Sequence, residues 1–174
     1  MEIPADLNPA CLPLAWLLGT WEGAGVGDYP TIEAFRFGQE VVFGYVPGKP
    51  FLTYSSATWR LSEDGVIGEP LARETGYWRP QPGGEVEVLL THPTGIIEIY
   101  LGTSEPAKVE LASRGVLKTE TAKDYRSATR LYGLVNGRLM WVMDMAAMGH
   151  DLQPHVSAEL RQVAGPVAQQ GCGG

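Results

Sequence analysis

The sequence predicts an all-β protein: a ten-stranded antiparallel up-and-down β-barrel with a short N-terminal helix. Runs rich in β-branched and aromatic residues recur along most of the 174 residues, and Gly, Pro, Asn or Asp bounds each run. Short turn sequences join consecutive runs, which favours antiparallel neighbours. An open meander of this length would leave two exposed sheet edges, and closure into a barrel removes them.

The only segment with helical character lies near the start. Asn8 and Pro9 can begin a turn, with Pro9 at a first helical position. Pro13–Leu18 then predicts a short apolar helix, and Gly19 ends it.

The strands follow one another with explicit turn signals. "SEDG" at 62–65 and "QPGG" at 81–84 are turn sequences, and "VNGR" at 135–138 contains Asn-Gly, a strong hairpin signal. Ten strands should enclose a larger cavity than an eight-stranded barrel. We expect one domain over residues 1–164 and a flexible Gly-rich tail over 165–174. The expected strands are Thr20–Val26, Glu33–Val46, Phe51–Leu61, Pro70–Arg79, Glu85–Thr91, Gly95–Gly102, Lys108–Ser113, Ser127–Val135, Arg138–Met145 and His155–Val163.

Composition narrows the classes of partner. Hydrophobic residues make up 44% and charged residues 19%, as in globular proteins. A net charge of -7 argues against nucleic acid or an anionic membrane as partner. No membrane span or secretory signal is evident, so we expect a cytoplasmic protein. Cys11 and Cys172 form no CxxC pair, and we expect neither a disulfide framework nor a zinc site.

The stretch "GTWEGAG" has small residues at alternate positions. Gly19, Trp21, Gly23 and Gly25 fall on one face of the first expected strand. Absent side chains on this face would let a flat ligand or another backbone approach closely. A kinked strand at a barrel corner explains the same pattern, and the sequence leaves both interpretations open.

The histidines differ in their expected settings. His92 lies in a turn, His150 in a loop, and His155 at the start of the last strand. Alternation puts His155 opposite Val156, Ala158 and Leu160, on a face shared with Ser157, Glu159 and Arg161. A lone strand histidine is more often an ordinary core or surface residue than a ligand.

The surroundings of His155 favour a ligand role. Pro154 rigidifies the entry to the strand, and Ser157 leaves room beside the ring. Methionines, which adapt to large flat ligands, are frequent in the preceding segment Met140–Met148, although ordinary core packing is the better explanation of this stretch taken alone. No catalytic triad order, P-loop or dinucleotide fingerprint appears, so no acid–base machinery is indicated.

Together these segments resemble the nitrobindin family over about Leu12 to Val163. The motif GxWxGxG is intact, and "YPT" (29–31), "ETGYWR" (74–79), "HPTGIIEI" (92–99) and "LQPHV" (152–156) are also similar to the family. The resemblance implies a ten-stranded barrel that holds ferric haem b. It implies His155 as the axial iron ligand and Thr31 in the haem pocket, with the motif residues Gly19, Trp21, Gly23 and Gly25 as further candidate haem contacts.

The same resemblance implies an activity. Family members bind nitric oxide and convert peroxynitrite to nitrate, so we expect a haem-dependent peroxynitrite isomerase with an open site on the iron. Its partners would be small molecules, and the oligomeric state stays open. The alternative is a non-catalytic carrier of the lipocalin or fatty-acid-binding type, for haem or another apolar ligand, with His155 as a polar anchor. A ligand-free structural barrel is a third possibility.

Overall fold

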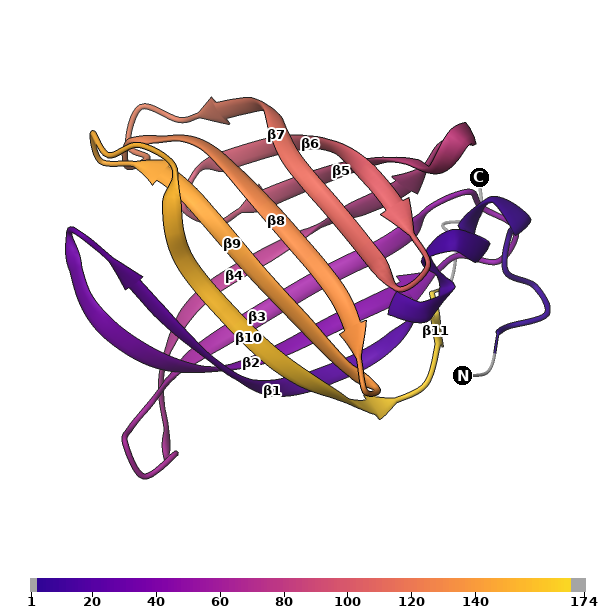
Figure 1. The fold of residues 1–174 in the computed structure, drawn as a ribbon, viewed down its shortest axis with the longest axis horizontal. Helices are drawn as coiled ribbons and strands as arrows, with labels where there is room; N and C mark the ends of the chain where they lie inside the picture. Colours follow the sequence, from indigo (N-terminus) through magenta and orange to yellow (C-terminus); the bar gives the residue numbers. More distant parts are fainter. Residues whose placement is uncertain (1–2, 170–174) are drawn as a thin grey trace.

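The strands form one continuous sheet that wraps into a barrel (Figure 1). This computed structural model describes residues 3–169. A 3-10 helix, η1 (Pro9–Leu17), precedes the strands, and a second, η2 (Pro82–Gly84), lies between β4 and β5. The strands are β1 (Gly19–Tyr29), β2 (Ile32–Tyr45), β3 (Leu52–Leu61), β4 (Ile67–Pro80), β5 (Glu85–His92), β6 (Ile96–Glu105), β7 (Lys108–Lys118), β8 (Tyr125–Val135), β9 (Arg138–Ala147), β10 (Gln153–Ala164) and β11 (Val167–Ala168).

The barrel is closed through β1. Each strand from β2 to β9 pairs antiparallel with the next along the chain, and β1 pairs with both β2 and β10. The predicted all-β class and ten-stranded antiparallel barrel are therefore confirmed. The Asn-Gly turn also forms between β8 and β9, with positive φ at Asn136 (51°) and Gly137 (76°).

The N-terminal helix differs from the prediction in type and extent. It is a 3-10 helix that begins at Pro9, and the Asn8 side chain caps it by accepting a hydrogen bond from the Ala10 amide at 2.9 Å. Pro13 lies inside it and has no amide hydrogen to donate. Gly19 does not end the helix but is the first residue of β1, with φ of 126°.

Part of the expected C-terminal tail is ordered against the barrel. Val167–Ala168 pair in parallel with Gly44 and Tyr45 of β2, and the Gln169 amide donates to the Tyr45 carbonyl at 2.8 Å. Cys172 and the rest of the Gly-rich segment lie outside the described residues. Within residues 3–169, no helix combines the length and hydropathy that a membrane crossing requires.

The helix η1 lies at one end of the barrel (Figure 1) and contributes to a solid core there. Leu14 and Leu17 are fully buried, and the Trp21 indole donates to the Leu17 carbonyl at 2.7 Å. Aromatic rings continue this core along the barrel axis: Phe43, Tyr54, Trp78, Tyr132 and Trp141 pack with neighbouring centroids 5.0–6.0 Å apart. Trp21 therefore joins helix and barrel through its ring and its indole N–H.

The glycines of "GTWEGAG" lie where β1 packs against its two neighbours. A Cβ on Gly23 would overlap the Glu159 carbonyl of β10, and one on Gly25 would overlap the Phe37 ring and the Ser157 carbonyl. The structure thus accounts for these glycines by close approach of backbone and side chains of the protein itself.

We predict that Gly23→Ala lowers the free energy of unfolding by about 1–3 kcal/mol, because the added methyl group must displace backbone atoms of β10. Gly115→Ala in β7 is the matched control, since a Cβ there meets no atom within 4 Å. Urea unfolding of both variants measures the effect. Equal stability of the two variants would contradict this account of β1.

Candidate functional site

A cavity of about 730 Å³ occupies the end of the barrel away from η1. This volume is typical of small-molecule and cofactor sites. Side chains from eight strands and one connection line it: Ile32, Glu33, Ala34, Phe35, Phe37, Gln39, Ser56, Thr58, Arg60, Leu71, Ala72, Arg73, Glu74, His92, Ile96, Glu98, Lys123, Tyr125, Arg130, Trp141, Met143, Met145, His155 and Val156.

His155 lines this cavity because a β-bulge interrupts the alternation of β10. The pairing with β9 passes from Pro154, opposite Asp144, to Val156, opposite Met143, so His155 is the extra residue. His155 and Val156 consequently both border the cavity. The strict alternation expected from the sequence, which put His155 on a face with Glu159 and Arg161, is wrong at this point.

The His155 ring has a defined orientation. Its Nδ1 lies 3.0 Å from the backbone carbonyl of Asp28, at the end of β1. A carbonyl oxygen can only accept, so Nδ1 carries the hydrogen and the lone pair of a neutral ring falls on Nε2. Among the described residues, Nε2 has no hydrogen-bond partner. Such a histidine, held through one nitrogen and open at the other, has the arrangement found in metal-ligating histidines.

Tyr29 supports this arrangement from the side. Its hydroxyl accepts from the Ala147 amide at 2.9 Å and lies within hydrogen-bond distance of the Met145 and Ala147 carbonyls. Its ring packs edge-on against His155, with centroids 5.4 Å apart, and against His150, at 5.9 Å. Tyr29 therefore ties the end of β1 to the end of β9 through its hydroxyl, and it contacts His155 near the start of β10 through its ring.

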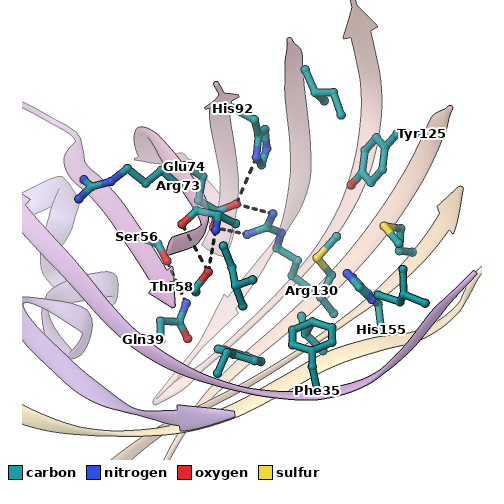
Figure 2. A pocket seen from close by; sticks show the side chains of 18 of the residues that line it. Phe35, Gln39, Ser56, Thr58, Arg73, Glu74, His92, Tyr125, Arg130 and His155 are labelled. Atoms are coloured by element: carbon teal, nitrogen blue, oxygen red, sulfur yellow. Dashed lines mark hydrogen bonds and ion pairs between the residues drawn. The ribbon is translucent and has the colours of Figure 1, made fainter. Parts of the chain in front are cut away.

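The walls near His155 are largely apolar. Figure 2 shows Phe35 of β2 near His155. Phe37 of β2, Met143 and Met145 of β9 and Val156 of β10 line the same cavity. Two of the four methionines noted in the sequence thus border the cavity, whereas Met140 and Met148 are 41% and 46% exposed. An imidazole beside flat and flexible apolar side chains suits a planar, mainly apolar ligand.

The floor of the cavity carries a buried ion pair that sequence reasoning missed. Arg130 of β8 binds Glu74 of β4 through both guanidinium ends, at 2.7 and 2.9 Å (Figure 2). The Arg130 side chain is only 2% exposed and that of Glu74 13%. The Tyr54 hydroxyl donates to the same Glu74 carboxylate at 2.6 Å.

A second carboxylate, Glu98 of β6, completes the cluster. It lies 3.6 Å from Arg130 and 2.7 Å from His92 Nε2. The hydroxyl groups of Tyr100, at 2.6 Å, and of Tyr125 donate to it. The other His92 nitrogen lies 3.8 Å from Glu74, so the four ionisable side chains form a closed ring of alternating cationic and anionic types.

This setting keeps both carboxylates ionised. Burial raises the pKa of Glu74, but the charge and hydrogen bonds of Arg130 more than offset it and hold that pKa at about 2. Burial likewise raises the pKa of Glu98, and the His92 hydrogen bond and the Arg130 charge bring it below its usual range. The pKa of the Arg130 guanidinium is raised, because its acidic and phenolic neighbours outweigh its burial.

Two segments that resemble the nitrobindin family supply three of the four residues of this ring, all but Arg130. "ETGYWR" begins with Glu74, and "HPTGIIEI" contains His92 and Glu98. One signal was present: Glu98 interrupts an apolar run on a strand and takes the inward positions of that strand together with Tyr100. The ion pair between Glu74 and Arg130 joins residues 56 positions apart in the sequence, so no local pattern indicates it.

The remaining predicted site residues lie outside the cavity lining. Thr31 is exposed in the β1–β2 turn, next to the lining residue Ile32. Gly19, Trp21, Gly23 and Gly25 do not border the cavity but pack at the β1–β10 seam. Of the other two histidines, which were not predicted as site residues, His92 borders the cavity and His150 lies in the β9–β10 connection. Within residues 3–169, no cluster of three or more His, Cys, Asp or Glu side chains has the arrangement of a metal site.

Comparison with known proteins adds to this geometry. A family model described as "THAP4-like, heme-binding beta-barrel domain" matches residues 10–162. A peroxynitrite isomerase of Nocardioides sp. is 48% identical over 91% of this chain and 96% of its own length. A ferric nitrobindin-like protein of Kineococcus radiotolerans is 47% identical over 94% and 99%. The crystal structure of Rv2717c from M. tuberculosis superposes with a TM-score of 0.81 at 41% identity, over 90% and 99% of the two chains.

We predict from the Glu74–Arg130 ion pair that the free energy of unfolding falls in acid. Glu74 takes up a proton at its ordinary pKa of 4.5 when unfolded, but only near 2 when folded. Its contribution of roughly 3 kcal/mol is therefore present above about pH 4.5 and is lost as the pH falls toward 2. Urea unfolding of the wild type at about pH 6 and about pH 3 measures this loss.

The double variant Glu74→Gln/Arg130→Met should show a smaller loss over the same interval, because it lacks the carboxylate with the depressed pKa. The exposed pair Arg60–Glu69 provides the control: Arg60→Met/Glu69→Gln should keep the wild-type dependence. If the Glu74→Gln/Arg130→Met variant loses as much unfolding free energy between these pH values as the wild type, this ion pair is not the source of the loss.

Proposed function

The chain belongs to the THAP4-like, heme-binding β-barrel domain family, and from this premise we propose that it binds ferric haem b through His155 and isomerises peroxynitrite to nitrate. The observation that carries the proposal is the His155 ring. Its Nδ1 is bound to the Asp28 carbonyl at 3.0 Å, which leaves Nε2 free at the wall of an apolar-sided cavity. This is the ring state that ligation of haem iron requires.

The chain's own residues fit the group. Phe35, Phe37 and Met143 offer flat and flexible apolar surface to a porphyrin. The carboxylate side chains of haem need cations or water, and Arg73 and Lys123 border the cavity with no salt bridge to another described residue. These two side chains are the candidates for that contact.

When bound, the haem supplies a Lewis-acidic iron with an open position for the peroxynitrite anion. Peroxynitrite and nitrate contain the same atoms and carry the same charge, so the conversion consumes no proton and no reductant. The protein therefore needs no general acid or base for the overall reaction. The Asp28 carbonyl and Tyr29 fix the ligand ring, and the apolar walls limit the access of water. The same open position would bind nitric oxide.

Removal of the proposed ligand histidine, His155, should weaken haem binding and change the spectrum of the bound haem. We predict that His155→Ala loses the Soret spectrum of a histidine-ligated ferric haem on titration of the apo-protein and weakens haem affinity at least about tenfold. His150→Ala and His92→Ala are the controls and should keep the wild-type spectrum. A wild-type spectrum in folded His155→Ala, with its loss in either control, would transfer the ligand role to another histidine.

Stopped-flow decay of peroxynitrite tests the activity, with substrate in large excess over protein and nitrate measured as product. The holo-protein should turn over many equivalents and raise the nitrate share, while the apo-protein and His155→Ala should not. The apo-protein is the necessary control because the five methionines and two cysteines consume oxidant stoichiometrically. Equal decay with holo- and apo-protein would contradict the isomerase function.

A further inference from the structure

Arg130, the cation in the cavity floor, uses four of its five N–H groups in hydrogen bonds, and Glu98 lies beside the remaining one. An arginine carries five N–H groups. In Arg130, Nε donates to the Tyr100 hydroxyl at 3.2 Å, and Nη1 donates to Glu74 at 2.7 Å and to Tyr132 at 3.4 Å. Nη2 donates to Glu74 at 2.9 Å and has its other carboxylate neighbour, Glu98, at 3.6 Å.

Without Glu74, the same position would be a strong carboxylate site. A guanidinium that is buried in a low-dielectric cavity and flanked by tyrosine hydroxyl groups binds a carboxylate bidentately and with little competition from water. In the structure Glu74 occupies that position, held in place by the Tyr54 hydroxyl at 2.6 Å. Its pKa of about 2 means that it does not protonate and release Arg130 at physiological pH.

We propose that Glu74 is a specificity residue: it fills the carboxylate site of Arg130 and so excludes apolar ligands with a carboxylate head, such as long-chain fatty acids, from the cavity floor. Glu74 holds both ends of the Arg130 guanidinium and Glu98 lies beside it, so an entering anion faces two carboxylates and finds no free end of the cation. A neutral amphiphile of the same length meets the same apolar walls without that repulsion. The inference concerns the floor alone and does not depend on haem binding.

The first test needs only the wild-type apo-protein. cis-Parinaric acid and the corresponding alcohol share one fluorescent chain and differ in the head group. We expect the acid to bind at least about tenfold more weakly than the alcohol at neutral pH, a difference that charge repulsion and the missing donors would supply. If the wild type binds the acid as tightly as the alcohol, the proposal is overturned.

The second test removes the Glu74 side chain, which frees the Arg130 guanidinium for a carboxylate ligand. Glu74→Ala should bind the acid at least about tenfold more tightly than the wild type, with alcohol affinity within about threefold. Glu33→Ala is the matched control: Glu33 also borders the cavity but makes no contact with Arg130, so this variant removes the same charge without freeing a donor. Glu74→Ala/Arg130→Met should lose the gained acid binding.

Circular dichroism and the unfolding midpoint establish that each variant is folded. A folded Glu74→Ala with no gain for the acid would overturn the proposal, as would an equal gain in Glu33→Ala. If Glu74→Ala does not fold, Glu74→Gln takes its place, because it removes the charge and keeps the side-chain volume. The wild-type comparison of acid with alcohol decides the matter independently of any variant.

Discussion

Closure of the barrel at β1 is the constraint on which the site depends. β1 must pair with β2 on one side and with β10 on the other, and Gly23 and Gly25 allow these neighbours to approach. The same seam ends at Asp28, whose carbonyl binds His155, and at Tyr29, whose hydroxyl binds the backbone of β9. Closure of the barrel and the orientation of the His155 ring are thus two consequences of one strand pairing.

The two ends of the barrel use different physical means to fill the interior. Near η1 the aromatic side chains pack against one another and leave a solid core. The floor of the cavity instead holds a buried guanidinium, two carboxylates and tyrosine hydroxyl groups, an arrangement that costs desolvation energy and is stable only when all members are satisfied. Arg130 meets this condition through Glu74, Glu98 and two tyrosines. Removal of one partner should therefore cost more than the loss of a surface ion pair.

The sequence predicted the fold well because its signals are local. Period-two patterns, glycine and proline turns and the Asn-Gly hairpin define the strands, and antiparallel neighbours in a meander need no long-range information. The β-bulge at His155 could not be predicted in this way. It depends on how β10 registers with β9, and that one extra residue turns His155 toward the cavity against the alternation of its neighbours. The ring around Arg130 also escaped prediction, because it joins Glu74, His92 and Glu98 of the consecutive strands β4, β5 and β6 to Arg130 on the more distant strand β8.

The β-bulge at His155 and the ring around Arg130 both bear on how the cavity would accept a haem under the proposed function. The bulge and the Asp28 carbonyl direct His155 from one wall, while the apolar side chains around it accept the porphyrin plane. Among the described residues, the arginine of the floor, Arg130, is already paired with Glu74 and flanked by Glu98. Carboxylates on the ligand are therefore better accommodated toward Arg73 and Lys123 than against the floor. If the Glu74–Arg130 pair excludes carboxylate ligands as proposed, it would also disfavour the carboxylates of a haem at the floor.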